Sequence, residues 1–273
     1  MKRASWVSGM GFVLLVLGCG GEVGDGVEVN PHTSTGEQAL VDPDGSSSDG
    51  TVYSYWYVRP DDANYLCWYG SAVGVGPYKA ILAAHQTLDE GDENNAYLSR
   101  YQGGTNNSDQ CASGRTRHKN FIGDKWLVTD VVEKDGQSQG NEYDLAVVTT
   151  STQLPSYRTV MGVPLTQDPP SGYVTWLGFG SAACGSFPTS IYRQYKVEDA
   201  TLDSYMIKAN SDTVGMGDSG GPVLFFGGVV VGVNNDCGNH TATNVTWTPN
   251  SDFLNDNGVS TSNCYACHPG GTF

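Results

Sequence analysis

One glycine-rich segment surrounds a single hydroxyl side chain and carries the strongest chemical signal in the chain. The segment reads Gly217-Asp218-Ser219-Gly220-Gly221-Pro222. Its glycines allow a sharp turn that leaves the Ser219 hydroxyl exposed. Backbone N–H groups beside a nucleophile can also point at an oxygen that gains negative charge during a reaction. The segment therefore predicts that Ser219 is a nucleophile.

A serine nucleophile needs a base to remove its proton and an acid to hold that base in the correct tautomer. His85 ends the segment Ala83-Ala84-His85, directly after the apolar strand expected over 79–82. Asp144 precedes the apolar run 145–148. Alone, either residue could be structural, but together with Ser219 they predict a base and its orienting acid. Three other acids lie in the same region and precede no comparable apolar run: Asp124, Asp130 and Asp135.

These three motifs, in the order His, Asp, Ser, resemble the signature motifs of chymotrypsin/trypsin-like serine proteases. The resemblance covers approximately residues 40–256. It implies an all-β fold with little helix, made of two perpendicular six-stranded antiparallel β-barrels with the active site in the cleft between them. It also implies that Ser219 attacks the scissile carbonyl, that His85 is the general base and that Asp144 orients it. The N–H groups of Gly217 and Ser219 would form the oxyanion hole, and no cofactor or metal is implied.

The same resemblance implies how the site is activated and how it selects substrates. Asp218 would pair with a new N-terminal amine after propeptide removal, and Leu40 is the best candidate for that terminus. The base of the substrate pocket would be Thr213, and Asn235 would lie on its wall. Because trypsin-like enzymes carry Asp at the pocket base, Thr213 does not indicate a preference for Arg or Lys. A neutral or mildly polar residue before the scissile bond is expected.

Two positions depart from the pattern that the resemblance leads us to expect. Family members usually place a cysteine directly after the catalytic histidine, whereas this chain has Gln86. They often place another cysteine four residues before the serine, whereas this chain has Gly215. The disulfides of this chain must therefore differ from the usual set.

Composition supports a β-rich domain. The 273 residues include 36 Gly, 15 Tyr and 6 Trp with only 16% charged residues, which favours strands and tight turns over long helices. Short aromatic and β-branched segments recur from residue 51 onward, and the one late helix expected is short, over 251–255 with Ser251 as N-cap. The net charge of −15 argues against a nucleic-acid partner. The mean hydropathy of −0.31 excludes a polytopic membrane protein.

The first residues are typical of a targeting signal. Lys2 and Arg3 precede a short apolar run, and Val16-Leu17-Gly18-Cys19 resembles the lipobox of bacterial lipoproteins. We therefore expect a signal peptide over 1–18, a lipid anchor on Cys19 and an acidic tether or propeptide over 19–39. The protein would be exported, and either anchored in the outer membrane or extracellular. Ordinary secretion with cleavage nearby is the alternative.

Six cysteines remain if Cys19 is lipidated, and an even number in an exported protein favours disulfides. Proximity within the family fold suggests three pairs: Cys67 with Cys111, Cys184 with Cys237, and Cys264 with Cys267. The last pair lies in a polar tail over 257–273. Cys264 and Cys267 with His268 also match the haem-attachment pattern C-x-x-C-H, so a haem-bearing surface protein is a further alternative.

The sequence thus predicts a monomeric serine endopeptidase that acts on protein or peptide substrates through an acyl-enzyme. The main alternative is a catalytically inactive binding module on a protease fold at the cell surface. Acidic residues soon after His85 could bind calcium, but their spacing matches no calcium loop and a solvated surface turn is the better explanation. They are Asp89, Glu90, Asp92 and Glu93.

Overall fold

In the computed structural model, the described residues all belong to the unit Thr35–Phe273. They are 40–41, 50–59, 62–87, 96–100, 103–104, 106–107, 116–119, 124–134, 141–162, 172–180, 190–191, 194–202, 205–209, 215, 217–225 and 228–262. For some strand residues only the backbone is described. The predicted signal peptide, Cys19, the whole tether over 19–39 and Thr213 lie outside these residues. So do the acidic cluster after His85 and four cysteines: Cys111, Cys184, Cys264 and Cys267.

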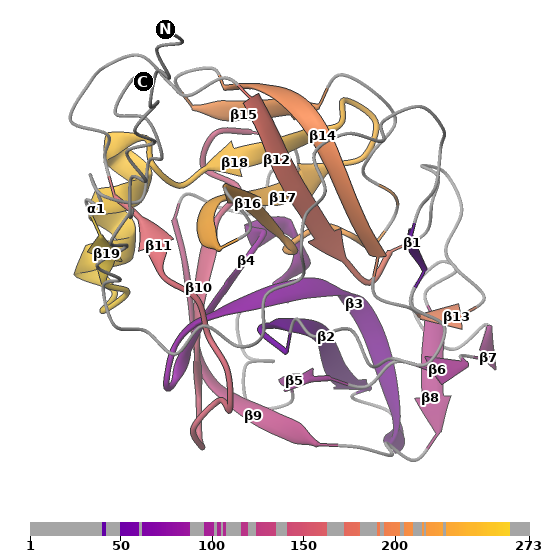
Figure 1. The fold of residues 1–273 in the computed structure, drawn as a ribbon. Coiled ribbons are helices and arrows are strands. Elements are labelled where there is room, and N and C mark those ends of the chain that lie inside the picture. Colours follow the sequence, from indigo (N-terminus) through magenta and orange to yellow (C-terminus); the bar gives the residue numbers. More distant parts are fainter. Residues whose placement is uncertain are drawn as a thin grey trace, which may run out of the picture. The chain divides into compact units, whose positions relative to one another are not determined.

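The N-terminal barrel is an antiparallel sheet whose strands follow one another around a ring (Figure 1). In spatial order the strands are β2 (Val52–Arg59), β5 (Ala96–Ser99), β9 (Lys125–Glu133), β10 (Ala146–Thr150), β4 (Lys79–Leu82) and β3 (Asp62–Gly76). The ring is closed because β3 also pairs with β2. The short strands β8 (Thr116–Lys119) and β7 (Asn106–Asn107) extend the sheet beyond β3.

The C-terminal barrel is a closed antiparallel ring of six strands, because β16 pairs with both β12 and β17. In spatial order the strands are β16 (Pro222–Phe225), β12 (Gly172–Gly178), β14 (Gln194–Leu202), β15 (Met206–Ala209), β18 (Thr241–Asn244) and β17 (Val229–Asp236). Three short strands are attached to this ring: β11 (Val160–Met161), β19 (Thr261–Ser262) and β1 (Leu40–Val41). A separate pair joins β13 (Ser190–Ile191) to β6 (Gly103–Gly104).

Strand β2 shows why this sequence forms strands that are buried on both faces. Aromatic and β-branched residues suit the pleated surface, and successive side chains point to opposite faces. Tyr53 and Tyr55 pack inside the N-terminal barrel, whereas Val52 and Trp56 face the other barrel. The prediction of a two-barrel, mostly β fold is therefore confirmed in the described part of the chain.

A cluster of buried apolar side chains, here called the junction core, joins the two barrels. It contains Ile81 and Leu145 from the N-terminal barrel, and Leu177 and Val233 from the C-terminal barrel, all at most 3% exposed. Ile81 belongs to β4 and Leu145 directly precedes β10, and each therefore lies within four residues of a predicted catalytic side chain. The position of that part of each barrel is consequently fixed by apolar contacts with the other barrel.

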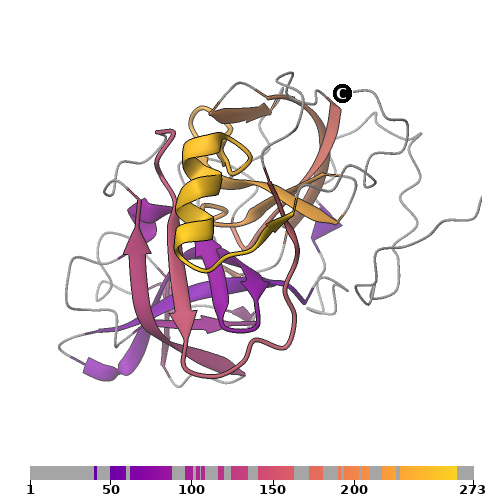
Figure 2. The ribbon, with the colours of Figure 1, turned by 90° about the vertical axis from the view of Figure 1, so that its left-hand side faces the viewer.

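The one α-helix among the described residues is α1 (Thr248–Asp256), which lies beside the place where the barrels meet (Figure 2). It buries Leu254 in the junction core. The predicted start at Ser251 is wrong by three residues, because Ser251 lies buried within the helix and Trp247 is the N-cap. Pro249 in the first turn marks the true start, where its missing N–H costs no hydrogen bond. No helix in the described ranges is long and apolar enough to span a membrane.

Candidate active site

Strand pairing in the N-terminal barrel brings His85 and Asp144 together. Strands β4 and β10 are antiparallel with Ala146 opposite Leu82. Continuing that register places Asp144 opposite Ala84, beside the short 3₁₀-helix η1 (Ala84–Gln86) that carries His85. The turn is closed by the Gln86 N–H, which donates to the Ala83 carbonyl at 3.1 Å. Two residues separated by 59 positions in the sequence thus become neighbours.

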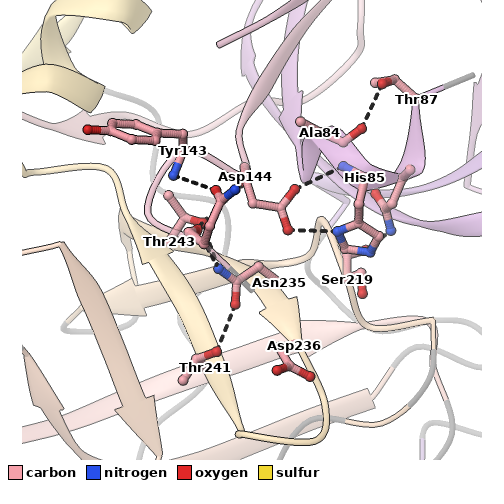
Figure 3. Close-up of polar contacts among 12 residues, drawn as sticks. Ala84, His85, Thr87, Tyr143, Asp144, Ser219, Asn235, Asp236, Thr241 and Thr243 are labelled. Carbon is pink, nitrogen blue, oxygen red and sulfur yellow. Dashed lines mark hydrogen bonds and ion pairs between the residues drawn. The ribbon is translucent and has the colours of Figure 1, made fainter. Parts of the chain in front are cut away.

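Both oxygens of the Asp144 carboxylate bind His85. Oδ2 lies 2.7 Å from His85 Nδ1, and Oδ1 accepts the His85 backbone N–H at 2.9 Å (Figure 3). The Asp144 side chain is fully buried, whereas the His85 side chain is 17% exposed. A buried carboxylate on Nδ1 favours the tautomer with the proton there. That tautomer leaves Nε2 free to accept a proton.

Ser219 comes from the other barrel, on the turn that precedes β16. Figure 3 shows it beside the His85 ring. The turn needs glycine because Gly217 and Gly220 have φ angles of 94° and 82°, in the region that side chains disfavour. No hydrogen bond joins the Ser219 hydroxyl to His85 or to any other described residue. The structure therefore brings together all three residues that the motifs singled out.

The backbone around Ser219 also leaves two N–H groups unused. The N–H groups of Asp218, Gly220 and Gly221 each donate to a backbone carbonyl. Those of Gly217 and Ser219 donate to no acceptor among the described residues. Two unpaired N–H groups beside a nucleophile can bind an oxyanion.

Asp218 lies between them and points away from the site, 4% exposed. Its Oδ1 accepts the Gly180 N–H at 2.7 Å and its Oδ2 accepts the Gly215 N–H at 2.8 Å. Burial raises the pKa of Asp218 from 3.8 to about 7, although the two backbone hydrogen bonds act in the opposite direction. Leu40, the predicted partner, lies in β1 opposite Tyr195 of β14. The ion pair between them stays a prediction about the processed chain.

The predicted wall residue Asn235 is fully buried beneath Asp144 (Figure 3). Its Nδ2 donates to Thr243 Oγ1 at 2.8 Å, and its Oδ1 accepts the Thr241 hydroxyl at 2.9 Å. Thr243 Oγ1 in turn lies 3.2 Å from the Asp144 carbonyl as a donor. The structure thus places the Asn235 side chain in the support of Asp144, while its neighbour Asp236 is half-buried. The predicted pocket base, Thr213, lies outside the described residues.

The remaining predicted groups are only partly described. Cys237 is 7% exposed, but no other cysteine side chain is described, so the three disulfide pairs stay predictions. The parts of the chain that the structure describes contain no group of three or more His, Cys, Asp or Glu side chains suited to a metal ion.

Several polar residues that support the site gave no signal of that role in the sequence. Ser71 Oγ donates to the Gly217 carbonyl at 2.9 Å and accepts the Phe179 N–H at 2.8 Å. Asn234 Nδ2 lies 3.3 Å from the Asp218 carbonyl. These contacts join residues that lie apart in the chain. The sequence marked neither Ser71 nor Asn234 for this supporting role.

Comparison with known proteins supports the fold. No protein-family model matches this sequence, and no curated protein matches it. Among solved structures, the chain resembles the scabies mite inactivated protease paralogue S-I1 with a TM-score of 0.52 and 14% identity, over 76% of this chain and 93% of that one. The chain therefore has the chymotrypsin-like two-barrel fold. At this identity the likeness shows the fold and not the activity.

Proposed function

We propose that this protein is a serine endopeptidase that hydrolyses peptide bonds through an acyl-enzyme on Ser219. One observation carries the proposal: a buried Asp144 binds His85 through both carboxylate oxygens, and Ser219 lies beside that histidine next to two unpaired N–H groups. A nucleophile, a base with its orienting acid and an oxyanion site are the parts that acyl transfer needs.

The reaction uses these groups in order. Ser219 Oγ attacks the scissile carbonyl carbon while His85 Nε2 takes its proton. The carbonyl oxygen becomes an oxyanion that accepts hydrogen bonds from the Gly217 and Ser219 N–H groups. The C–N bond then breaks, and the amine leaves with the proton from His85. Water attacks the acyl-enzyme in the same way, with His85 as base, and restores the Ser219 hydroxyl. Asp144 stabilises the charged histidine at each step.

The finer expectations belong to the same proposal. Export through a signal peptide over 1–18, a lipid anchor on Cys19 and a tether over 19–39 would place the enzyme at the cell surface or outside it. Cleavage before Leu40 would supply an amine for Asp218. These expectations rest on sequence patterns, as do the disulfide pairs, the pocket residues Thr213 and Asn235, and the monomeric state.

The proposal is tested by fluorophosphonate labelling of the purified protein, with mass spectrometry to locate the adduct and the mature N-terminus. An activated serine attacks the phosphorus and displaces fluoride, whereas an ordinary serine does not react. We expect one adduct on Ser219, no labelling of Ser219→Ala, and nearly none of His85→Ala. If a processed, folded chain is not labelled, the inactive binding module becomes the better explanation. The inactivated state that the scabies mite protein's name describes would then apply to this chain as well.

A further inference from the structure

We propose that Gln86 is a positioning residue that ties the Ser219 carbonyl to the turn carrying His85. It thereby sets the distance between nucleophile and base across the two barrels. This inference rests on the proposed peptidase function and adds a residue to it. Gln86 directly follows His85 in η1 and is 1% exposed. Its Nε2 donates a hydrogen bond to the carbonyl oxygen of Ser219.

The Ser219 carbonyl receives a second donor from the same barrel. The Ser71 N–H, in β3, lies 2.8 Å from it. A carbonyl oxygen has two lone pairs, and both are thus directed to the N-terminal barrel. Ser71 acts through its backbone N–H, which any residue type except proline could supply. Gln86 acts through its side chain, so its contribution depends on the residue type and can be removed by substitution.

The surroundings of the Gln86 amide are shaped to hold it. A Cβ atom on Gly70 would overlap Gln86 Nε2, and one on Gly220 would overlap Gln86 Oε1. Two glycines from different barrels therefore leave a slot that the amide fills. Gln86 Oε1 has no hydrogen-bond partner among the described residues. A buried, unpaired oxygen carries a free-energy cost, which this site bears while Nε2 binds the Ser219 carbonyl.

The contacts hold the peptide groups on both sides of Ser219. In a peptide group the C=O and N–H point in opposite directions. Asn234 and the Gly221 N–H bind the Asp218 carbonyl. The Ser219 N–H belongs to the same peptide group and therefore points the other way, which leaves it unpaired. Gln86 binds the next carbonyl, that of Ser219 itself. With both planes fixed, only the Ser219 side-chain torsion remains free.

Two substitutions separate a positioning role from space filling. Gln86→Met is close in size but lacks the donor. It should lower kcat and the fluorophosphonate labelling rate by roughly 10- to 100-fold, as small misplacements of reacting groups do. The KM should stay within about twofold of wild type, because no substrate contact is removed. Gln86→Glu restores a donor only while the introduced carboxyl is protonated, and burial favours that neutral form.

The pH profile is the decisive readout. For Gln86→Glu, the ratio of its labelling rate to that of wild type should be highest at low pH and should fall as the carboxyl ionises and repels the Ser219 carbonyl. For Gln86→Met the ratio should not change with pH. A merely space-filling residue would give no such difference. Taking ratios to wild type removes the pH effects that are common to all three proteins.

Ser99→Ala is the matched control. Ser99 is fully buried in the N-terminal barrel and its hydroxyl donates to the Asp124 carbonyl at 2.8 Å, away from the site. It should lose stability without losing labelling rate. Wild-type labelling rates in folded Gln86→Met, or parallel pH profiles for both Gln86 variants, would overturn the inference. An unlabelled wild type would instead refute the peptidase proposal, and thermal unfolding separates both results from misfolding.

Discussion

Removing the charge from Asp218 should change how stability depends on pH. The Asp218 carboxyl is buried and its pKa is raised from 3.8 to about 7. Between these values the folded chain binds a proton that the unfolded chain has released. The free energy of unfolding therefore falls as pH rises through this window. The contribution is fully present below about pH 4 and is lost by about pH 7.

The size of the effect follows from the shift. Roughly three pKa units at about 1.4 kcal/mol each correspond to about 4 kcal/mol between the ends of the window. The N–H groups of Gly180 and Gly215 stabilise the charged form at 2.7 and 2.8 Å and are already included in that shift. Burial is the larger influence, so the sign is that of a carboxyl kept neutral.

The assay is urea unfolding between pH 4 and 8, with the Ser219→Ala variant as parent to prevent self-digestion. Asp218→Asn in that background keeps the shape but cannot ionise. The parent should lose stability relative to the Asn variant as pH rises, by up to about 4 kcal/mol. The pH effects that are common to both proteins cancel in the difference.

Parallel curves would refute the reasoning, because they would mean that Asp218 is ionised throughout and that the two backbone N–H groups outweigh burial. A chain processed at Leu40 is a further comparison. If its new amine reaches Asp218, the opposite charge should lower the pKa, and the loss of stability with rising pH should disappear.

Three further substitutions test other parts of the site. Asp144→Asn should lower kcat by about 10⁴-fold with little change in KM, because the histidine is then held in the wrong tautomer; steady-state kinetics would show it, and a loss under tenfold would contradict the role. Gly220→Ala should destabilise the fold by more than about 2 kcal/mol and abolish labelling, because the φ angle of Gly220 is 82° and a Cβ atom there would overlap the Ser71 carbonyl. Unchanged urea unfolding would contradict this. Leu254→Ala should cost about 2–5 kcal/mol by leaving a cavity in the junction core, while labelling survives at low temperature; loss of labelling in a folded variant would contradict it.

The three candidate catalytic residues were predictable because their local motifs carry the information. Gly217 to Pro222 identifies Ser219, and the apolar runs beside His85 and Asp144 mark strand ends. Their assembly was not predictable from spacing, because it depends on the register of β4 against β10 and on the contact between barrels. The resemblance supplied the two-barrel architecture, which the structure confirms.

What sequence reasoning missed has a common cause. Gln86 and Ser219 are 133 residues apart, and Ser71 and Gly217 are 146 apart. Polar side chains of this kind look like ordinary surface residues until the fold buries them against a carbonyl. The helix start failed for a local reason: Ser251 was preferred as a cap, whereas Pro249 was the better marker.

The division of the site between two barrels has a consequence during synthesis. The ribosome makes His85 and Asp144 long before the turn that carries Ser219, and the junction core needs Leu254 and Val259 near the end of the domain. A nascent chain therefore holds a base without its nucleophile. Under the proposed function, proteolytic capacity arises in one step when the last helix docks, and the cell that makes the enzyme is not exposed to a half-built version of it.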